Sequence, residues 1–143
     1  AVRLTGAQVR DVLEHSARYY DGLECVPDGG CTVLADSAIP HYNVDNMAGV
    51  DYRIDPTRPE GSRIRDLRYN GLPLDPEAEF IVACNSYRAA SGGFYPHLEA
   101  AEVVWRSSEE MPDLIGDYLD NHRPWRPAVD GNWRIGRDIV AEE

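Results

Sequence analysis

The residues with the greatest chemical capacity gather in one stretch, CNSYRAASGGFYP, which spans residues 84–96. The stretch follows an apolar run, FIVAC. Side chains that leave a strand end often form sites, because the strand holds the backbone while they project into open space. Tyr87 can offer a flat ring to a planar ligand, and Arg88 can pair with a phosphate or stack. Gly92 and Gly93 carry no side chain, so a ligand could approach the backbone closely there. A structural alternative stays open, in which Tyr87 packs into the core and the glycines only turn the chain.

Groups that carry out catalysis by themselves are not recognisable in the sequence. No two histidines have the spacing of metal ligands, and they are scattered over His15, His41, His97 and His122. We expect surface roles for His15 and His122. The chain has no nucleophile elbow, no phosphate-binding P-loop and no GxGxxG after a strand. Its acidic residues form no dyad or two-metal ligand set, so the sequence predicts neither a catalytic site nor a cofactor in this chain.

Composition limits the class of partner. The 143 residues suffice for one domain with its own core. With 14 basic and 25 acidic residues the net charge is -11, which argues against nucleic acid or an anionic membrane as the main partner. No apolar run is long enough to span a membrane, and no signal peptide opens the chain. Because the chain starts at Ala1 without an initiator methionine, we expect it to be cut from a longer protein.

Two of the three cysteines could pair. Cys25 and Cys31 flank the turn-rich segment VPDGG, and we hypothesise a disulfide between them, which would fit an exported protein. Two free loop thiols are the alternative. Their spacing is not that of a zinc site. Cys84 follows an apolar run and is expected to be a small buried side chain.

The first half of the chain begins with a predicted helix. LTGAQVRDVLEHSARYYDG has the pattern of an amphipathic helix, with Thr5 and Gln8 as a capping box and Gly22 as the stop signal. Its apolar stripe consists of Val9, Val12, Leu13 and Ala17. Residues 24–48 are rich in Pro and Gly and predict loop.

The second half predicts strands and one more helix. VDYRID and SRIRDLRYN alternate as half-buried strands do, and the continuous apolar run FIVAC is typical of a strand covered on both faces. AEVVW and GNWRI are shorter strand candidates. SEEMPDLIGDYLDNH predicts a helix capped by Ser108, with Pro112 in its first turn and an inward stripe of Leu114, Ile115, Tyr118 and Leu119. The sum is a single α+β domain, a mixed β-sheet with packed helices.

Three segments resemble the C-terminal domain of the 5'-nucleotidase family: LTGAQVRDVLE, YNVDNMAGVDYRIDPTRPEGSRIRDLRYNGLPLDP and EFIVACNSYRAASGGFYP. Their order and spacing match from Leu4 to about Trp133, nearly the whole chain. Within the family, YNVD, NSYRA and GNWRI most resemble the bifunctional 2',3'-cyclic-nucleotide 2'-phosphodiesterase/3'-nucleotidase branch.

The resemblance implies the nucleotide-recognition half of an enzyme with two domains that is secreted, periplasmic or associated with the cell wall. The other half, a metallophosphoesterase domain upstream of Ala1, would hold two divalent metal ions and the catalytic side chains. A rotation of the present domain would deliver the bound nucleotide or nucleoside part to those metals. On this interpretation residues 1–143 are one domain, truncated at its N-terminal edge, and are inactive alone.

The resemblance also assigns a nucleotide pocket, formed by Tyr87, Asn85, Arg88, Gly92, Gly93, Asn43 and Asp45. Tyr87 matches one of two aromatic rings that hold the base, and the other ring and the phosphate-binding arginines should precede Ala1. Family members often carry Asp after the two glycines, where it contacts the ribose. This chain has Phe94 there, so that contact is not expected.

Two other functions stay open on the same resemblance. The chain could come from a 5'-nucleotidase or UDP-sugar hydrolase. It could also be a non-catalytic binding module of a family member with a non-nucleotide substrate such as thiosulfate.

Overall fold

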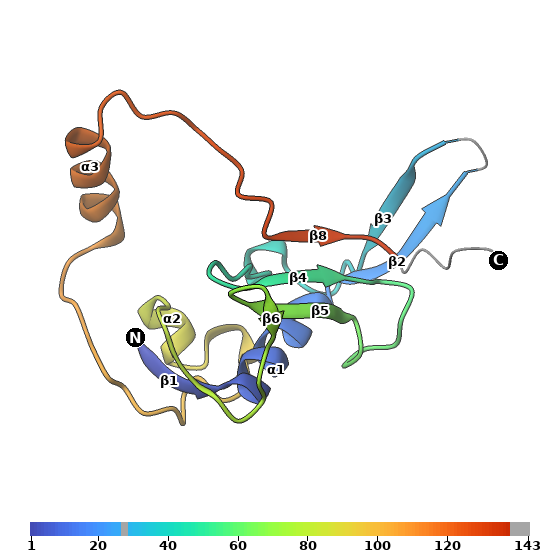
Figure 1. Cartoon of the computed structure of the whole chain (residues 1–143), viewed down its shortest axis with the longest axis horizontal. Helices are drawn as coiled ribbons and strands as arrows, with labels where there is room; N and C mark the ends of the chain where they lie inside the picture. The colour runs from blue at the N-terminus through green and yellow to red at the C-terminus, as the bar shows by residue number, and fades with distance from the viewer. Residues whose placement is uncertain (27–28, 138–143) are drawn as a thin grey trace.

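Helix α1 (Gly6–Ala17) is central to the fold, in a computed structural model that describes residues 1–26 and 29–137 (Figure 1). The predicted capping box is confirmed: Gln8 N donates to Thr5 Oγ1 at 3.3 Å, and Thr5 N donates to Gln8 Oε1 at 2.9 Å. The whole predicted apolar stripe is buried. The predicted stop at Gly22 is wrong, because the helix ends at Ala17 and the chain continues as a strand.

A four-stranded sheet covers one side of the core, in the order β6-β5-β4-β8. Its strands are β4 (Asp51–Ile54), β5 (Ile64–Tyr69), β6 (Leu72–Pro73) and β8 (Trp133–Ile135). β8 runs parallel to β4, and the other pairs are antiparallel. The sheet is therefore mixed, as predicted, and the strands expected in VDYRID, SRIRDLRYN and GNWRI are confirmed.

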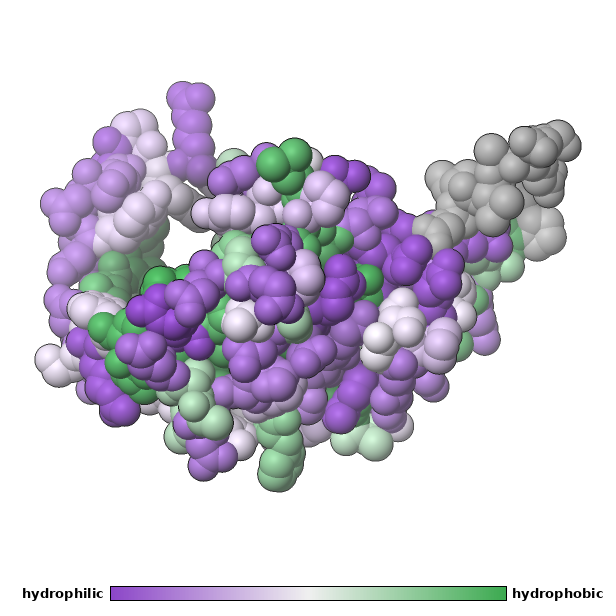
Figure 2. All heavy atoms as spheres, turned by 60° about the horizontal axis from the view of Figure 1, so that its bottom comes forward, coloured by the Kyte–Doolittle hydropathy of each residue, from purple (hydrophilic) through white to green (hydrophobic). Residues whose placement is uncertain are grey.

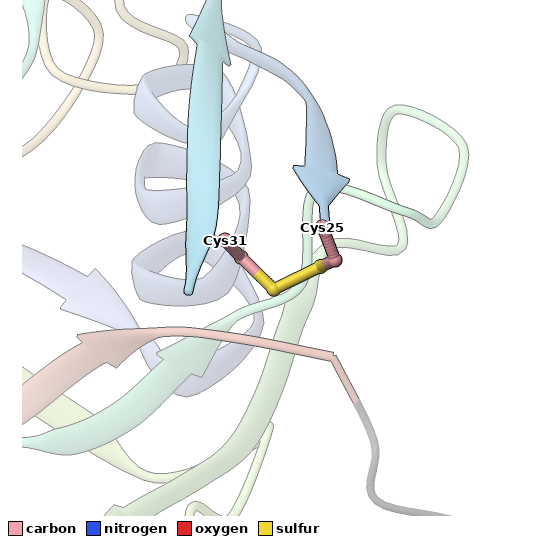
Figure 3. Close-up of a disulfide and its surroundings, with 2 residues drawn as sticks. All are labelled: Cys25 and Cys31. Atoms are coloured by element: carbon pink, nitrogen blue, oxygen red, sulfur yellow. A yellow bond between two sulfur atoms is a disulfide. The ribbon is translucent and has the colours of Figure 1, made fainter. Parts of the chain in front are cut away.

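A hairpin projects from the body (Figure 1), and a disulfide links its two strands (Figure 3). It consists of β2 (Tyr20–Cys25) and β3 (Cys31–Ala35), and the sulfurs of Cys25 and Cys31 are bonded at 2.01 Å. Both cysteines lie in register at the end of the ladder. The prediction of loop for residues 24–48 is wrong where β3 lies, since this largely exposed hairpin lacks a strong apolar alternation. Residues 27–28 of that range fall outside the described part.

A two-stranded ribbon joins the start of the chain to its middle. β1 (Val2–Thr5) pairs antiparallel with β7 (Glu79–Val82). The chain also forms three short helical turns. A 3-10 helix at His41–Asn43 precedes β4, and α2 (Ser86–Ala89) and a second 3-10 turn at Gly92–Phe94 follow β7. The expectation that FIVAC is covered on both faces is wrong for the described residues, because Ile81 is 56% exposed. AEVVW forms only an isolated bridge, from Val103 to Val2.

An arm, residues 106–132, carries α3 (Met111–Asn121) away from the body, as Figure 1 shows at the left. The helix and Pro112 in its first turn are as predicted, but the N-cap is Glu110 and has no side-chain hydrogen bond. The expected inward stripe is wrong, since its four side chains are 37% to 54% exposed. The helical pattern is local, whereas burial requires a facing surface, and the described residues supply none.

Candidate functional site

Arg88 is the centre of the predicted site, and it is 4% exposed. Nε and Nη2 donate to the two carboxylate oxygens of Asp45, at 2.6 and 2.8 Å. Nη1 donates to Asn43 Oδ1 and to the Gly92 carbonyl, both at 3.0 Å, and Nη2 also donates to the Tyr42 carbonyl at 3.0 Å. All five guanidinium N–H groups therefore have acceptors within the chain. The hydrogen bond to Asp45 raises the pKa of Arg88 above its ordinary value.

Asn85 turns the chain where the strand segment ends. It is the N-cap of α2, and its Oδ1 accepts the Arg88 N–H at 2.8 Å. The cap places the next residues on one short helical turn, so that consecutive side chains diverge. Arg88 enters the interior while Tyr87 stays 54% exposed.

The Tyr87 ring rests on Gly92. A Cβ at Gly92 would lie 2.6 Å from both Cδ atoms of the ring and 2.5 Å from the Tyr87 carbonyl oxygen. Equal distances to both Cδ atoms place Gly92 against the face of the ring. The guanidinium carbon of Arg88 is 5.2 Å from the ring centroid, within cation-π range. One face of the ring therefore rests on Gly92, and the side chain is open to solvent. This exposure contradicts the alternative in which Tyr87 is a core residue.

Gly93 allows the loop to close over Arg88. Its φ is +76°, and a Cβ there would lie 2.6 Å from Arg88 Nη1 and 2.8 Å from Asn43 Oδ1. Both the left-handed backbone and the close approach exclude other side chains. Phe94 follows at φ 59° and is 87% exposed, so the residue after the two glycines points an apolar ring into solvent.

Helix α1 supports the loop from behind through Tyr95, which sequence reasoning missed. The Tyr95 side chain is buried, its hydroxyl donates to the Asn43 carbonyl at 2.9 Å, and it accepts the Asp45 N–H at 3.0 Å. Ser16 on α1 contacts the same hydroxyl. Burial raises the pKa of Tyr95, so the phenol stays protonated and holds Asn43 and Asp45 in place. Nothing in the local pattern separates this buried ring from the exposed Tyr87.

His15 also belongs to this support, which corrects the surface role expected for it. Its Nε2–H donates to the Gly93 carbonyl at 2.9 Å, and its ring centroid lies 4.5 Å from that of Tyr95. Burial is the main cause that lowers the pKa of His15, and Arg18 and Arg88 act in the same direction. The neutral imidazole is therefore favoured, and it donates one hydrogen bond to the loop.

A cavity of about 750 Å³ adjoins the inner side of the site. It lies between α1, residues 45–50 and β7, and its lining is mostly apolar, with Asp45 and Arg88 on one wall. Tyr87 does not line it. Cys84 does, half-buried, and burial raises the pKa of its thiol. The aromatic platform and the cavity are therefore separate features that share the Arg88–Asp45 pair.

Over residues 1–26 and 29–137, no three His, Cys, Asp or Glu side chains come together as a metal site. In the same residues, no helix is both long enough and apolar enough to cross a membrane. The site can hold a flat ligand ring against Tyr87. The hydrogen bonds of Arg88, Asn43 and Asp45 fix the loop that carries the Tyr87 ring.

Comparison with known proteins gives relatives of one kind. A trifunctional nucleotide phosphoesterase protein, YfkN, of Bacillus subtilis is 36% identical over 94% of this chain, which covers 10% of that relative. A 2',3'-cyclic-nucleotide 2'-phosphodiesterase/3'-nucleotidase of Haemophilus influenzae is 31% identical over 94% of this chain and 23% of its own length. The chain therefore spans a quarter or less of these relatives.

Two solved structures resemble this chain in fold. A Staphylococcus aureus protein described as a 5'-nucleotidase, in complex with alpha-ketoglutarate, superposes with a TM-score of 0.79 at 30% identity. The match covers 94% of this chain and 26% of that one. The sulfate thiohydrolase SoxB of Thermus thermophilus, at 23% identity and a TM-score of 0.64, shares the fold.

The family model described as 5'-nucleotidase, C-terminal domain, matches residues 1–100. This range includes α1, the Arg88 network and the loop under Tyr87. The chain belongs to the 5'-nucleotidase C-terminal domain family.

Proposed function

We propose that this chain is the nucleoside-recognition domain of a two-domain, metal-dependent nucleotide phosphohydrolase. Its branch would be the 2',3'-cyclic-nucleotide 2'-phosphodiesterase/3'-nucleotidases. The single observation that carries the proposal is the Tyr87 ring, 54% exposed and held flat on Gly92. A nucleobase stacks on such a ring without requiring sequence-specific contacts.

The polar residues of the pocket have two roles in this proposal. All five N–H groups of the Arg88 guanidinium donate to oxygens of this chain. In this proposal Arg88 therefore positions Gly92 and Tyr87 and has no N–H group left to bind a phosphate. Asp45 has a side chain that is 41% exposed even with Arg88 bound, and one of its oxygens could accept a ribose hydroxyl. Asn43 is committed to Arg88 and to the turn beside Gly93.

Catalysis would lie in a metallophosphoesterase domain of the same parent protein, by which we mean the longer protein that contains this chain. That domain would supply two divalent metal ions, and this chain would supply the specificity. An exported parent is supported by the Cys25–Cys31 disulfide, because such bonds persist in oxidising compartments. The 3'-nucleotidase branch is supported by identities of 29% to 31%, against 22% for a protein named UshA.

The test is kinetic and uses the parent protein with 2',3'-cyclic AMP, 3'-AMP and 5'-AMP. Loss of one base-aromatic stack costs roughly 1–3 kcal/mol. Tyr87→Ala should therefore raise KM about five- to hundredfold. Tyr87→Phe should be nearly silent, because stacking uses the ring and not the hydroxyl. Trp125→Ala is the control, an aromatic side chain of similar exposure, 53%, in the arm.

Two outcomes would count against the proposal. If Tyr87→Ala lowers the melting temperature but leaves KM unchanged, the ring is structural and the pocket lies elsewhere. If 5'-AMP is the preferred substrate, the branch is wrong although the role of Tyr87 stands. A further arm tests the division of labour: this chain alone, with Mn²⁺ or Zn²⁺ added, should not hydrolyse any of the three nucleotides.

A further inference from the structure

A second cavity, of about 680 Å³, lies between the disulfide-linked hairpin and the four-stranded sheet. We call it the arginine crevice, and its side-chain lining includes the apolar residues Leu23, Val33 and Ile135 and the charged residues Arg53, Asp66, Arg134 and Arg137. Figure 1 places the hairpin at the opposite end of the body from α2, which carries Tyr87. Hydrophilic side chains cover most of the face in Figure 2, and acidic residues outnumber basic ones by 25 to 14 in the chain. A crevice with three arginines and one aspartate therefore has a charge opposite to that of the whole molecule.

The strand register aligns three arginines on one face of the sheet. Arg53 of β4 lies opposite Arg65 on β5 and opposite Arg134 on β8. Side chains alternate along a strand, and Tyr52 and Ile54, on either side of Arg53, are buried in the core. The arginines therefore belong to the other face, which meets the hairpin. Like charges directly opposite one another destabilise a sheet, so this row requires negative charge beside it.

Carboxylates of the chain compensate the central arginine of the row. Arg53 is 7% exposed, and its Nε donates to Asp66 Oδ2 at 3.2 Å. Its Nη1 lies 3.7 Å from Asp55 Oδ2 and donates to the Gly136 carbonyl at 2.8 Å. Asp66 has φ 54° where the register between β4 and β5 shifts, and a bulge of this kind re-aims a side chain. Arg53 is therefore fixed in place and forms the floor of the crevice.

Arg134 and Arg137 have no such compensation. Both side chains line the crevice and both residues are exposed. No hydrogen bond or ion pair joins either of them to another residue of the described ranges 1–26 and 29–137. A guanidinium is a planar fork of N–H donors that matches the oxygens of a phosphate or a carboxylate. Two such forks in one crevice carry two positive charges, which a phosphate dianion balances and a single carboxylate does not.

We propose that the arginine crevice binds a small phosphomonoester, whose phosphate lies on Arg134 and Arg137 and whose apolar body packs against Leu23 and Val33. The volume of about 680 Å³ is within the range of small-molecule sites, roughly 300–1,000 Å³, and is larger than a bare phosphate fills. The apolar wall opposite the arginines gives the rest of the ligand a surface that water does not solvate well. This proposal does not rest on the nucleoside pocket at Tyr87, which is a different site.

The test is isothermal titration calorimetry of this chain at pH 8 and constant ionic strength, with phenyl phosphate, inorganic phosphate and benzoate as probes. Phenyl phosphate should bind at least about tenfold more tightly than benzoate, which has the same ring and a single charge. Arg134→Gln should weaken the binding of both phosphates at least about tenfold, because it removes a charged fork. Leu23→Ala should weaken phenyl phosphate about three- to tenfold through lost apolar contact, and it should leave inorganic phosphate unchanged.

Arg126→Gln is the matched control, the same substitution at an exposed arginine of the arm, and it should leave all three dissociation constants unchanged. Arg137→Gln, outside any strand, is a second variant and should weaken both phosphates as Arg134→Gln does. Tyr87→Ala should have no effect on these constants. The proposal is overturned if phenyl phosphate does not bind at about 10 mM, if benzoate binds equally well, or if Arg126→Gln costs as much as Arg134→Gln. Loss of phenyl phosphate binding in Tyr87→Ala alone would also overturn it, because the probe would then occupy the aromatic platform.

Discussion

The loop around Arg88 and the arm that carries α3 are both irregular, but they are held in different ways. Arg88 reaches Asp45 and Tyr42 across 43 and 46 positions, Tyr95 reaches Asn43 across 52, and His15 reaches Gly93 across 78. Within the arm, Asn121 and His122 each bond a carbonyl four positions back. The arm rejoins the body at Asn132, whose side-chain amide donates to the Met47 and Val50 carbonyls.

The difference separates two sources of order. Long-range hydrogen bonds to buried groups fix the Arg88 loop from within this chain, so its geometry should survive in isolation. Local hydrogen bonds fix the helical shape of α3 but not its position. A ligand platform must be placed precisely to a few tenths of an ångström, and only the first region meets that demand within the described residues.

The largest expected effect comes from Arg88→Met. The change removes five hydrogen bonds to oxygen from a buried side chain and leaves the Asp45 carboxylate without its arginine. We expect the free energy of unfolding to fall by about 3–5 kcal/mol, measured by urea denaturation of this chain. Arg123→Met is the control in the arm, where Arg123 pairs with Asp120 in solvent, and it should cost no more than about 0.5 kcal/mol. Equal losses would mean that the two regions are not held differently.

A smaller effect is expected from two glycines that share a backbone conformation. Gly93 in the loop has φ +76° and Gly131 in the arm has φ +67°, but only a Cβ at Gly93 meets neighbours within 4 Å. Gly131→Ala should cost about 1–2 kcal/mol, the strain of a left-handed alanine. Gly93→Ala should cost about 1–2 kcal/mol more, because Arg88 and Asn43 must move. If urea denaturation gives equal costs, the close approach in the loop is wrong.

The sequence predicted the features that depend on neighbours in the chain. The Thr5–Gln8 capping box and the buried stripe of α1 are examples. Local hydrogen bonding and hydrophobic periodicity are sufficient to recognise them. The family resemblance then named Asn43 and Asp45 as part of the same site.

The sequence could not show how those residues are connected. From its type alone Arg88 could pair with a phosphate or stack, but its partners at Tyr42 and Asp45 are set by the tertiary fold. His15 was assigned to the surface because no other histidine has metal-ligand spacing to it, and its contacts with Gly93 and Tyr95 arise only in the tertiary fold. The burial of α3 was predicted from a correct pattern, and its exposure here reflects what surrounds the helix and not the helix itself.

The smallest expected effect concerns pH. Burial lowers the pKa of His15 below its ordinary value of 6.5, so the unfolded chain binds this proton more tightly than the folded one. The stability that the neutral imidazole contributes is present above pH 6.5 and is lost as pH falls through the lower folded value. Arg18 and Arg88 oppose protonation, whereas Asp45 and the Gly93 carbonyl favour it, and the Tyr95 ring packs against the imidazole.

His15→Gln isolates this contribution, because a glutamine amide can still donate to the Gly93 carbonyl but does not titrate in this range. Urea midpoints of this chain between pH 7.5 and 5 should fall more for the wild type than for His15→Gln. His122→Gln is the matched control for the same substitution away from the loop, because the His122 ring packs on Tyr118 of α3. Parallel curves for the wild type and His15→Gln would show that the imidazole gains nothing from its place behind the loop. The supporting role would then belong to Tyr95 alone, and the Tyr87 platform would be held from the Arg88 side only.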